Sequence, residues 1–101
     1  MRKSKKEDKY QAHVMERLEK TFPGAIVTKL QPYIQGIPDV AIFYEDKWGV
    51  LECKREQKAK HRPNQDYYVD KMNKMSFASF VYPENEEEVF DAIQSAFRIE
   101  R

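Results

Sequence analysis

Hydrophobic residues recur along the chain with two different periods, and the change of period marks the predicted elements. An apolar residue at every fourth position predicts a first helix over about residues 6–22, with one apolar face. These apolar residues are Tyr10, Val14, Leu18 and Phe22. Pro23 and Gly24 follow directly and are expected to end the helix.

Shorter apolar stretches then predict three consecutive strands, over about residues 25–31, 38–44 and 48–54. Pro32 and Gly36 bracket a loop between the first two strands. Polar residues at 45–47 are expected to form the turn between the second and third strands. This arrangement predicts a hairpin.

The rest of the chain predicts a helix over about 64–75, a strand over about 77–82 and a helix over about 86–98. Asn85 and Glu88 are spaced like the two partners of a capping box at the start of the last helix. The element order α-β-β-β-α-β-α predicts the α/β class, with a mixed central sheet flanked by helices.

Length and charge narrow the functional classes. The chain has 101 residues, and we expect residues 1–101 to form a single domain. Lys and Arg number 18 against 17 for Asp and Glu, which excludes a generally basic protein. The charges are segregated, however, with basic segments at 2–9 and 54–62 and an acidic one at 84–91. These segments are either ordinary solvent-exposed surface or local binding surfaces.

Cys53 is the single cysteine, so no disulfide and no cysteine-based zinc site can form within the chain. A reducing cytoplasm is the expected compartment. No apolar stretch approaches the ~20 residues that a membrane helix needs. The basic N-terminal segment lacks the apolar centre of a signal peptide, so neither secretion nor a membrane partner is expected.

Chemically useful side chains meet in the predicted hairpin. Side chains alternate along a strand, so Glu52 and Lys54 share a face while Cys53 points to the other, into the core. Asp39 joins them only if the turn has an even length. A two-residue turn at 46–47 places it opposite Lys54, and a four-residue turn at 44–47 places it opposite Glu52. A three-residue turn places it opposite Cys53 instead.

Two carboxylates and a lysine have a chemical use in this arrangement. Neighbouring carboxylates repel unless a cation neutralises them, and their hard oxygen atoms suit Mg²⁺ or Mn²⁺. Such a metal polarises a phosphoryl oxygen and lowers the pKa of a bound water. A lysine beside it stabilises negative charge in the transition state. The alternative is a cross-strand salt bridge between Lys54 and a carboxylate, the more frequent arrangement for an arbitrary pair.

Three further residues are candidates for the same site. Glu7 and Gln11 lie near the apolar side of the first helix, from which a carboxylate would reach the hairpin. An N-terminal glutamate favoured by the helix dipole explains Glu7 equally well. Gln65, at the start of the second predicted helix, would bind a water or a phosphate, or is a simple first-turn polar residue.

These residues occur in an order that resembles one group of nucleases. Pro38-Asp39 and Glu52-Cys53-Lys54, with Glu52 thirteen residues after Asp39, resemble the motif of the PD-(D/E)xK nuclease superfamily. The fuller pattern resembles the virus-type replication-repair nuclease family, VRR-Nuc, in its small stand-alone form, over about residues 7–82. Its residues are Glu7, Gln11, Lys29, Gly36-Ile37-Pro38-Asp39, Glu52-Cys53-Lys54 and Gln65. The predicted element order also fits the restriction-endonuclease-like core of that superfamily.

The resemblance implies a DNA endonuclease that hydrolyses phosphodiester bonds with Mg²⁺ or Mn²⁺. It implies that Asp39 and Glu52 bind the metal, with the backbone carbonyl of Cys53 completing its shell. Glu7 is then an outer or second-metal carboxylate. Lys54 is the catalytic lysine, and Gln65 supports the water or the substrate strand.

The resemblance also implies partners, since small stand-alone members are homodimers that cut branched DNA such as four-way (Holliday) junctions. No helix-turn-helix or zinc-finger pattern is visible, so DNA shape is expected to be recognised rather than sequence. The residues expected to contact DNA are Lys5, Lys6, Lys9, Gln11, Lys29, Arg55, Lys58, Lys60 and Arg62. The loop 55–63 is lysine-rich where relatives often carry glycines, which leaves the preferred DNA shape open.

Two rival functions stay open. One is a non-cleaving module that binds DNA or a protein on a nuclease fold. Clustered carboxylates argue against it, because they are costly without a metal. The other is a nicking subunit of a larger replication, repair or restriction complex, for which a monomer in solution would argue. Small size and the family resemblance indicate an intracellular protein of a phage or prophage, with a role in DNA repair or recombination.

Overall fold

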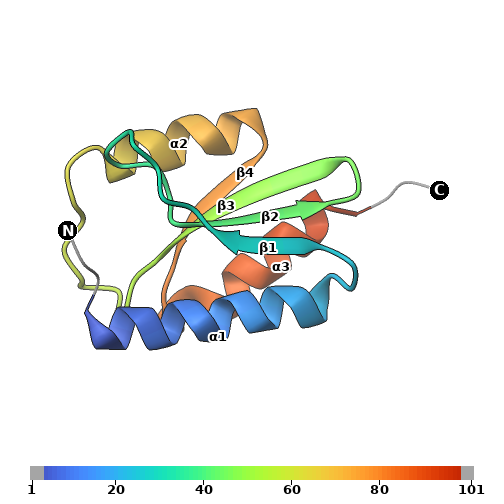
Figure 1. The fold of residues 1–101 in the computed structure, drawn as a ribbon, viewed down its shortest axis with the longest axis horizontal. Helices are drawn as coiled ribbons and strands as arrows, with labels where there is room; N and C mark the ends of the chain where they lie inside the picture. Colours follow the sequence, from blue (N-terminus) through green and yellow to red (C-terminus); the bar gives the residue numbers. More distant parts are fainter. Residues whose placement is uncertain (1–3, 99–101) are drawn as a thin grey trace.

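The protein is a four-stranded sheet with helices on both faces in the computed structural model, which describes residues 4–98 (Figure 1). Its order of helices and strands confirms the predicted α-β-β-β-α-β-α arrangement, with one short 3₁₀ turn added before the last helix. No helix within the described residues is long and apolar enough to cross a membrane. The elements are α1 Lys5–Thr21, β1 Ile26–Lys29, β2 Val40–Tyr44, β3 Lys47–Cys53, α2 Gln65–Met75, β4 Phe77–Val81, η1 Pro83–Asn85 and α3 Glu86–Ala96.

The sheet is mixed, as predicted, with the strand order β1-β2-β3-β4. The first three strands are antiparallel neighbours, and β4 runs parallel to β3. A parallel pair needs a crossover connection, and α2 supplies it. Because β2 and β3 are antiparallel, the start of β2 and the end of β3 lie at the same end of the molecule, at the left of Figure 1.

The hairpin between β2 and β3 pairs Phe43 with Trp48 and Tyr44 with Lys47, so its turn consists of Glu45 and Asp46 alone. The same pairing of strands was expected for a four-residue turn at 44–47. The structure reaches it with a two-residue turn at 45–46. Glu45 makes the tight turn possible with a positive φ of 58°. Since Val40 lies opposite Leu51, continuing the register by one residue puts Asp39 opposite Glu52.

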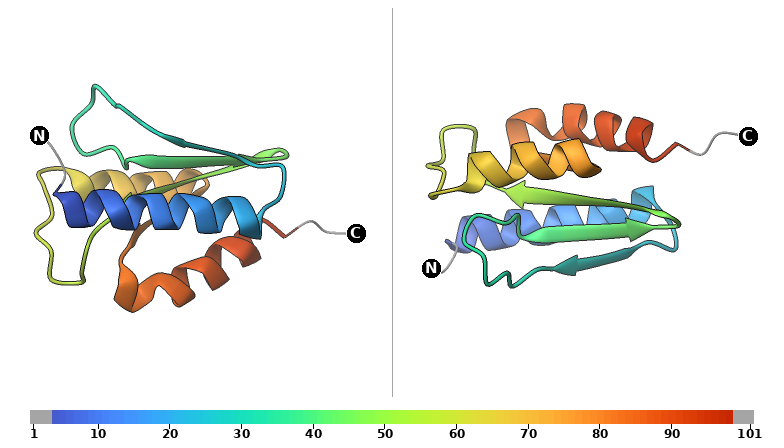
Figure 2. Two further views of the ribbon diagram at one scale, coloured as in Figure 1. Left: turned by 60° about the horizontal axis from the view of Figure 1, so that its bottom comes forward. Right: turned by 90° about the horizontal axis from the view of Figure 1, so that it is seen from above.

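The sheet lies between helices (Figure 2), and an apolar layer packs on each of its faces. The larger joins α1 and α3 to one face and includes Val14, Leu18, Phe90 and the buried side chain of Cys53, whose predicted inward direction is confirmed. The smaller layer lies beneath α2, where the buried residues are Ala41, Val50, Val69 and Ala78. Because strand side chains alternate, Glu52 and Lys54 are on the α2 face, opposite to Cys53.

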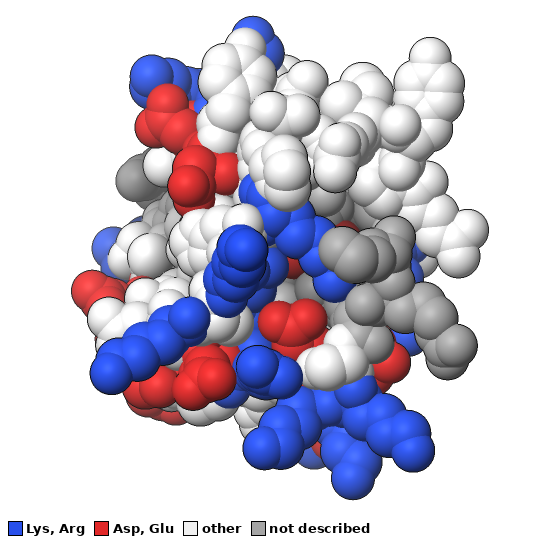
Figure 3. Space-filling view, turned by 90° about the vertical axis from the view of Figure 1, so that its left-hand side faces the viewer, with Lys and Arg blue, Asp and Glu red and all other residues white. Residues whose placement is uncertain are grey.

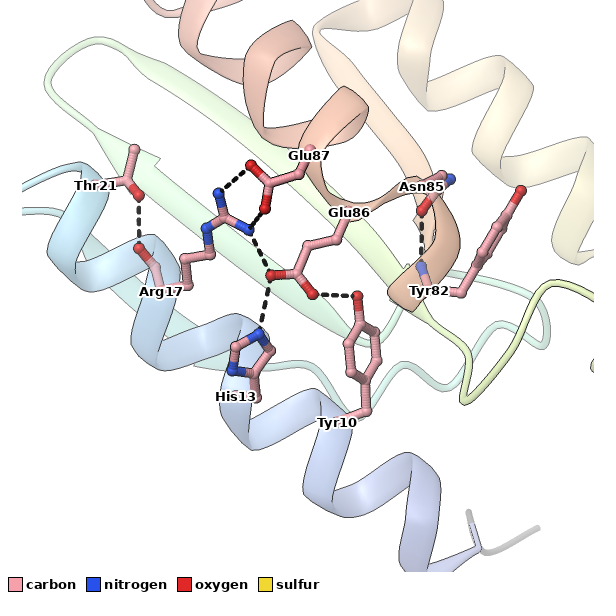
Figure 4. A network of polar contacts seen from close by, with 8 residues as sticks. All are labelled: Tyr10, His13, Arg17, Thr21, Tyr82, Asn85, Glu86 and Glu87. Carbon is pink, nitrogen blue, oxygen red and sulfur yellow. Dashed lines mark hydrogen bonds and ion pairs between the residues drawn. The ribbon is translucent and has the colours of Figure 1, made fainter.

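A polar network connects α1 to the start of α3 beside the larger apolar layer (Figure 4). The Glu86 carboxylate accepts hydrogen bonds from Tyr10 Oη (2.8 Å) and Arg17 Nη1 (2.6 Å), and His13 Nε2 lies 2.9 Å from it. Burial disfavours the charged form of Glu86, but these contacts outweigh burial and lower its pKa. The pKa of Tyr10 is raised, chiefly by its burial and secondly by its hydrogen bond to Glu86.

The prediction of a capping box at the start of α3 is wrong. Asn85 is the N-cap residue, but its side chain makes no capping hydrogen bond. Its Oδ1 instead accepts from the backbone N–H of Tyr82 (2.8 Å; Figure 4), and its Nδ2 donates to the Phe80 carbonyl (3.2 Å). The 3₁₀ turn Pro83–Asn85 therefore uses the Asn85 side chain to close itself onto β4.

Candidate active site

A cleft of about 660 Å³ opens at the end of the sheet where β2 begins and β3 ends. Its walls come from α1, from the loop between β1 and β2, and from the segment before α2, and the residues that line it include Asp39 and Glu52 of the hairpin. Figure 3 views the molecule from this end and shows Lys and Arg side chains around acidic ones. The cleft-lining residues are Asp8, Gln11, Lys29, Leu30, Gln31, Pro32, Tyr33, Ile34, Gln35, Gly36, Ile37, Asp39, Glu52, Arg62, Pro63 and Gln65.

Asp39 is anchored through both carboxylate oxygens. Gln11 Nε2 donates to its Oδ2 at 2.8 Å, and the backbone N–H of Cys53 donates to its Oδ1 at 3.2 Å. The buried residue Pro38 precedes Asp39, and its ring fixes the backbone φ angle at that position. The helix and both strands of the hairpin thus converge on one carboxylate.

Glu52 and Lys54 lie behind Asp39, and each is 2% exposed. Lys54 Nζ is 4.0 Å from Glu52 Oε2 and donates to the backbone carbonyl of Lys60 at 3.2 Å. The backbone N–H of Lys54 donates to Val81, which extends the pairing of β3 with β4 by one residue. A charged pair is tolerated inside a protein only with such partners, so the ammonium is held in one place.

Gln65 is buried at the first position of α2 and lines the cleft. Its Oε1 accepts a hydrogen bond from the backbone N–H of Arg62 at 2.8 Å, which folds the end of the basic loop onto the helix. Asn64, between them, has a positive φ of 70°. The role of Gln65 in supporting a water or the substrate strand stays a prediction. Its hydrogen bond to Arg62 positions the basic loop.

Glu7 is buried on α1 one turn before Gln11, but it is not among the residues that line the cleft. No group of three or more His, Cys, Asp or Glu side chains is arranged to hold a metal ion within residues 4–98. Glu7 therefore does not join Asp39 and Glu52 in such a group. Its role as an outer or second-metal carboxylate stays a prediction.

The donor set at the cleft floor nevertheless fits Mg²⁺ or Mn²⁺. Two carboxylates from neighbouring strands face the same cleft. In a strand the N–H and C=O of one residue point to the same side, so the Cys53 carbonyl is on the side of its bond to Asp39. Mg²⁺ usually keeps several waters and takes only one or two carboxylates from the protein, so a third acidic side chain is not required.

The predicted DNA-contacting residues divide into two groups. Lys29, Gln11 and the half-buried Arg62 line the cleft itself. The others are exposed around it, and three of them border a second hollow of about 580 Å³ beside the start of α1. These three are Lys6, Lys9 and Arg55, and the remaining exposed ones are Lys5, Lys58 and Lys60. Arg2 and Lys3 of the basic segment 2–9 lie outside the described residues.

The loop 31–37 was not predicted as part of the site, yet it contributes seven neighbouring residues to the cleft wall. Gly36 holds this loop against the segment before α2, with a φ of +102° and a position where a Cβ would lie 2.7 Å from the backbone of Asn64. An uncharged stretch bounded by Pro32 and Gly36 looks like a plain connection in the sequence. The Gly-Ile-Pro-Asp order was a signal for close backbone approach that could have been used.

Comparison with known proteins shows what the fold is similar to. No family model matches the sequence, and no curated protein matches it. A solved structure described as a VRR_NUC domain matches with a TM-score of 0.68 and 25% sequence identity, over 90% of this chain and 97% of that one. The resemblance seen in the order of residues thus extends to the whole fold. The chain is therefore a VRR-Nuc-like domain with a nuclease-type fold.

Proposed function

We propose that the protein is a metal-dependent endodeoxyribonuclease that hydrolyses phosphodiester bonds of branched DNA. The observation that carries this proposal is the position of Asp39 opposite Glu52 at the floor of the cleft, with the Lys54 ammonium 4.0 Å from Glu52. Two carboxylates and a lysine at one end of a mixed sheet are the groups that metal-assisted phosphate hydrolysis requires.

Asp39 and Glu52, with the carbonyl of Cys53, would hold Mg²⁺ or Mn²⁺. When bound, the metal supplies Lewis-acid polarisation of the phosphate and a water of lowered pKa. The protein positions these ligands beforehand. Gln11 fixes one oxygen of Asp39, and the Cys53 N–H fixes the other, so the carboxylate does not have to reorganise when the substrate arrives.

Lys54, which is not itself among the residues that line the cleft, contributes a fixed positive charge beside Glu52. The Lys60 carbonyl holds its ammonium from the side of the basic loop, and Glu52 lies on the other. In this position the ammonium stabilises the negative charge that develops on the phosphate oxygens, in a site largely shielded from water. Gln65 keeps the loop that carries Lys60 and Arg62 closed against α2.

DNA binding is attributed to local basic groups, because the net charge of the whole chain is only +1. Lys29 and Arg62 are placed for phosphates inside the cleft, and exposed lysines of α1 and of the loop 55–63 for phosphates further along the strand. Such contacts position DNA without reading its sequence. A homodimer would present two such sites to a branched substrate, and two-fold dimers are the commonest assembly.

The substrate test compares a labelled four-way junction with a linear duplex and a single strand of matched sequence. Each is incubated with the protein in Mg²⁺, in Mn²⁺ and in EDTA. The proposal predicts cutting of the junction in both metals and none in EDTA. Binding of DNA without cutting in either metal would contradict the enzyme and favour a non-cleaving module. Cutting of all three DNAs at equal rates would contradict the preference for branched DNA.

A further inference from the structure

A large aromatic side chain stands at the rim of the cleft, almost entirely in solvent. Tyr33 is 97% exposed, although it belongs to the loop that forms one cleft wall. Its neighbour Ile34 is also exposed, and Pro32 and Ile37 line the same wall. An apolar tip of this kind contributes nothing to the core, so its aromatic ring is accessible to a ligand that enters the cleft.

The base of this loop is fixed, which gives Tyr33 a defined place relative to the cleft floor. The backbone N–H of Leu30 donates to the Asp39 carbonyl at 2.8 Å and closes the loop at its foot. At its far side, Gly36 lies so close to Asn64 that no larger residue would fit. The tip therefore projects from a foundation shared with Asp39 and α2.

The two walls of the cleft differ in chemistry. Residues 31–37, with the sequence QPYIQGI, carry no charged side chain. The cations of the cleft, Lys29 and Arg62, lie outside this stretch. Figure 3 shows the same division, with uncharged side chains gathered in the upper right of this face and Lys and Arg side chains below and beside them. A wall without cations does not attract phosphates, but it offers an aromatic face.

A nucleotide has one group for the cationic part of this cleft and another for its uncharged wall. Its phosphate matches the cations and the floor, and its flat base matches the aromatic ring. Stacking of a base on an aromatic side chain stabilises binding and tolerates any sequence, because every base has a flat face. In a continuous duplex both faces of each base are covered by its neighbours, so only an unpaired or unstacked base presents a free face.

We propose that Tyr33 stacks on an unpaired base next to the phosphate held in the cleft and so directs the enzyme to DNA with unpaired bases near the cut. This inference rests on the proposed function, because it requires DNA in the cleft. It adds a residue and a physical basis for substrate choice: the branch is recognised through an exposed base, and the phosphates only position the strand.

The experiment measures DNA binding by fluorescence anisotropy in EDTA, where hydrolysis is not expected, for a junction with unpaired bases at its branch and for a fully paired linear duplex. Tyr33→Ala is expected to weaken binding of the junction about tenfold and that of the duplex less than about twofold. Tyr33→Phe, which keeps the ring, is expected to bind like the wild type. Tyr67→Ala removes another exposed aromatic residue, 59% exposed on α2 and outside the cleft lining, and serves as the matched control.

The outcomes separate this inference from the proposed function, which is followed by cleavage of the same DNAs in Mg²⁺. Equal weakening of both DNAs by Tyr33→Ala, an unchanged junction affinity, or an equal effect of Tyr67→Ala would overturn the stacking role while metal-dependent cutting stood. Selective loss of junction binding without any cutting by the wild type would support stacking and overturn the nuclease. Absence of binding to either DNA would overturn both.

Discussion

At the scale of single residues, the candidate site depends on charges held inside the protein. Lys54 and Glu52 are nearly inaccessible, and each is expensive to bury without its partners. Proteins keep such pairs where a fixed charge has a use, and a cleft floor facing a polyanion is such a place. The buried position of Lys54 therefore favours a role in catalysis over one in attracting DNA from solution.

Lys54→Met tests this role, because methionine keeps much of the side-chain length and removes the charge. We expect DNA cleavage to slow by about a hundredfold or more, the usual loss when one group that stabilises transition-state charge is removed. Single-turnover cleavage and DNA affinity are measured side by side. A variant that loses affinity but keeps its cleavage rate at saturating enzyme would show that Lys54 only binds DNA.

The sequence predicted these residues through the alternation of strands. Even turn lengths place Asp39 and Glu52 on one face, and the structure has an even turn. The exact turn could not be predicted from the sequence, because it depends on a positive φ at Glu45, which glutamate rarely adopts. The contacts of Lys54 with the Lys60 carbonyl and of Gln65 with the Arg62 N–H were also beyond reach, since both depend on the path of an irregular loop.

At the scale of elements, close contacts between segments distant in the sequence hold the cleft in shape. The loop 31–37 meets the start of α2 at Gly36, and α1 meets α3 at Glu86. Both contacts were absent from the sequence-based predictions, although the helices and strands themselves were found within a few residues of their bounds. Periodicity indicates which face of an element is apolar, but it does not show which polar residues meet across two elements.

Gly36→Ala is expected to disturb the cleft more than it disturbs the rest of the fold. Alanine at φ +102° is strained, and its Cβ would also collide with the backbone of Asn64. Gly24→Ala is the matched control, because Gly24 has a similar φ of +91° but no atom within 4 Å of the added Cβ. Denaturant unfolding and DNA cleavage are measured for both variants. Equal losses of stability and activity would show that backbone strain alone matters.

Glu86→Gln tests the link between α1 and α3 through its dependence on pH. The pKa of Glu86 is lowered in the folded protein from its ordinary value of 4.5, so the charged form stabilises the fold above that pH. This stabilisation is lost as the pH falls through the folded pKa. We expect wild type to exceed Glu86→Gln in stability by about 1–3 kcal/mol at neutral pH. The difference should shrink as the pH falls below the ordinary value of 4.5 and through the lowered pKa of the folded protein.

Glu87→Gln is the control for this experiment, because Glu87 binds the same Arg17 but its side chain is 81% exposed. Solvent screens an exposed pair, so the loss of the Glu87 carboxylate is expected to cost much less stability than the loss of the Glu86 carboxylate. Thermal or urea unfolding between pH 3 and pH 8 measures both variants. A Glu86→Gln variant as stable as Glu87→Gln at neutral pH would show that the buried network does not join the helices.

At the scale of the whole molecule, one end carries the candidate site and the rest supports it. The cleft, the basic loop and the start of both α1 and α2 lie at this end (Figures 1 and 3). The fold class could be predicted from the order of elements, and the VRR-Nuc-like fold from the order of a few polar residues. The cleft could not, because its wall is a loop without periodicity.

The proposed homodimer is tested by light scattering of the protein at several concentrations, with and without junction DNA. We expect a mass twice that of the chain, because two cuts on a branched substrate require two sites held together. A monomer at all concentrations, also on DNA, would favour a subunit of a larger complex. The test is independent of catalysis, so variants that do not cut DNA serve equally well.

The most direct test of the central claim is the metal dependence of cleavage at the Asp39–Glu52 pair. Junction cleavage is titrated with Mn²⁺ for the wild type, Asp39→Asn and Glu52→Gln, with Asp70→Asn, an exposed carboxylate of α2, as control. The account predicts cutting that depends on Mn²⁺ in wild type and control and is abolished in the other two folded variants. Undiminished cleavage by Asp39→Asn or Glu52→Gln would contradict it.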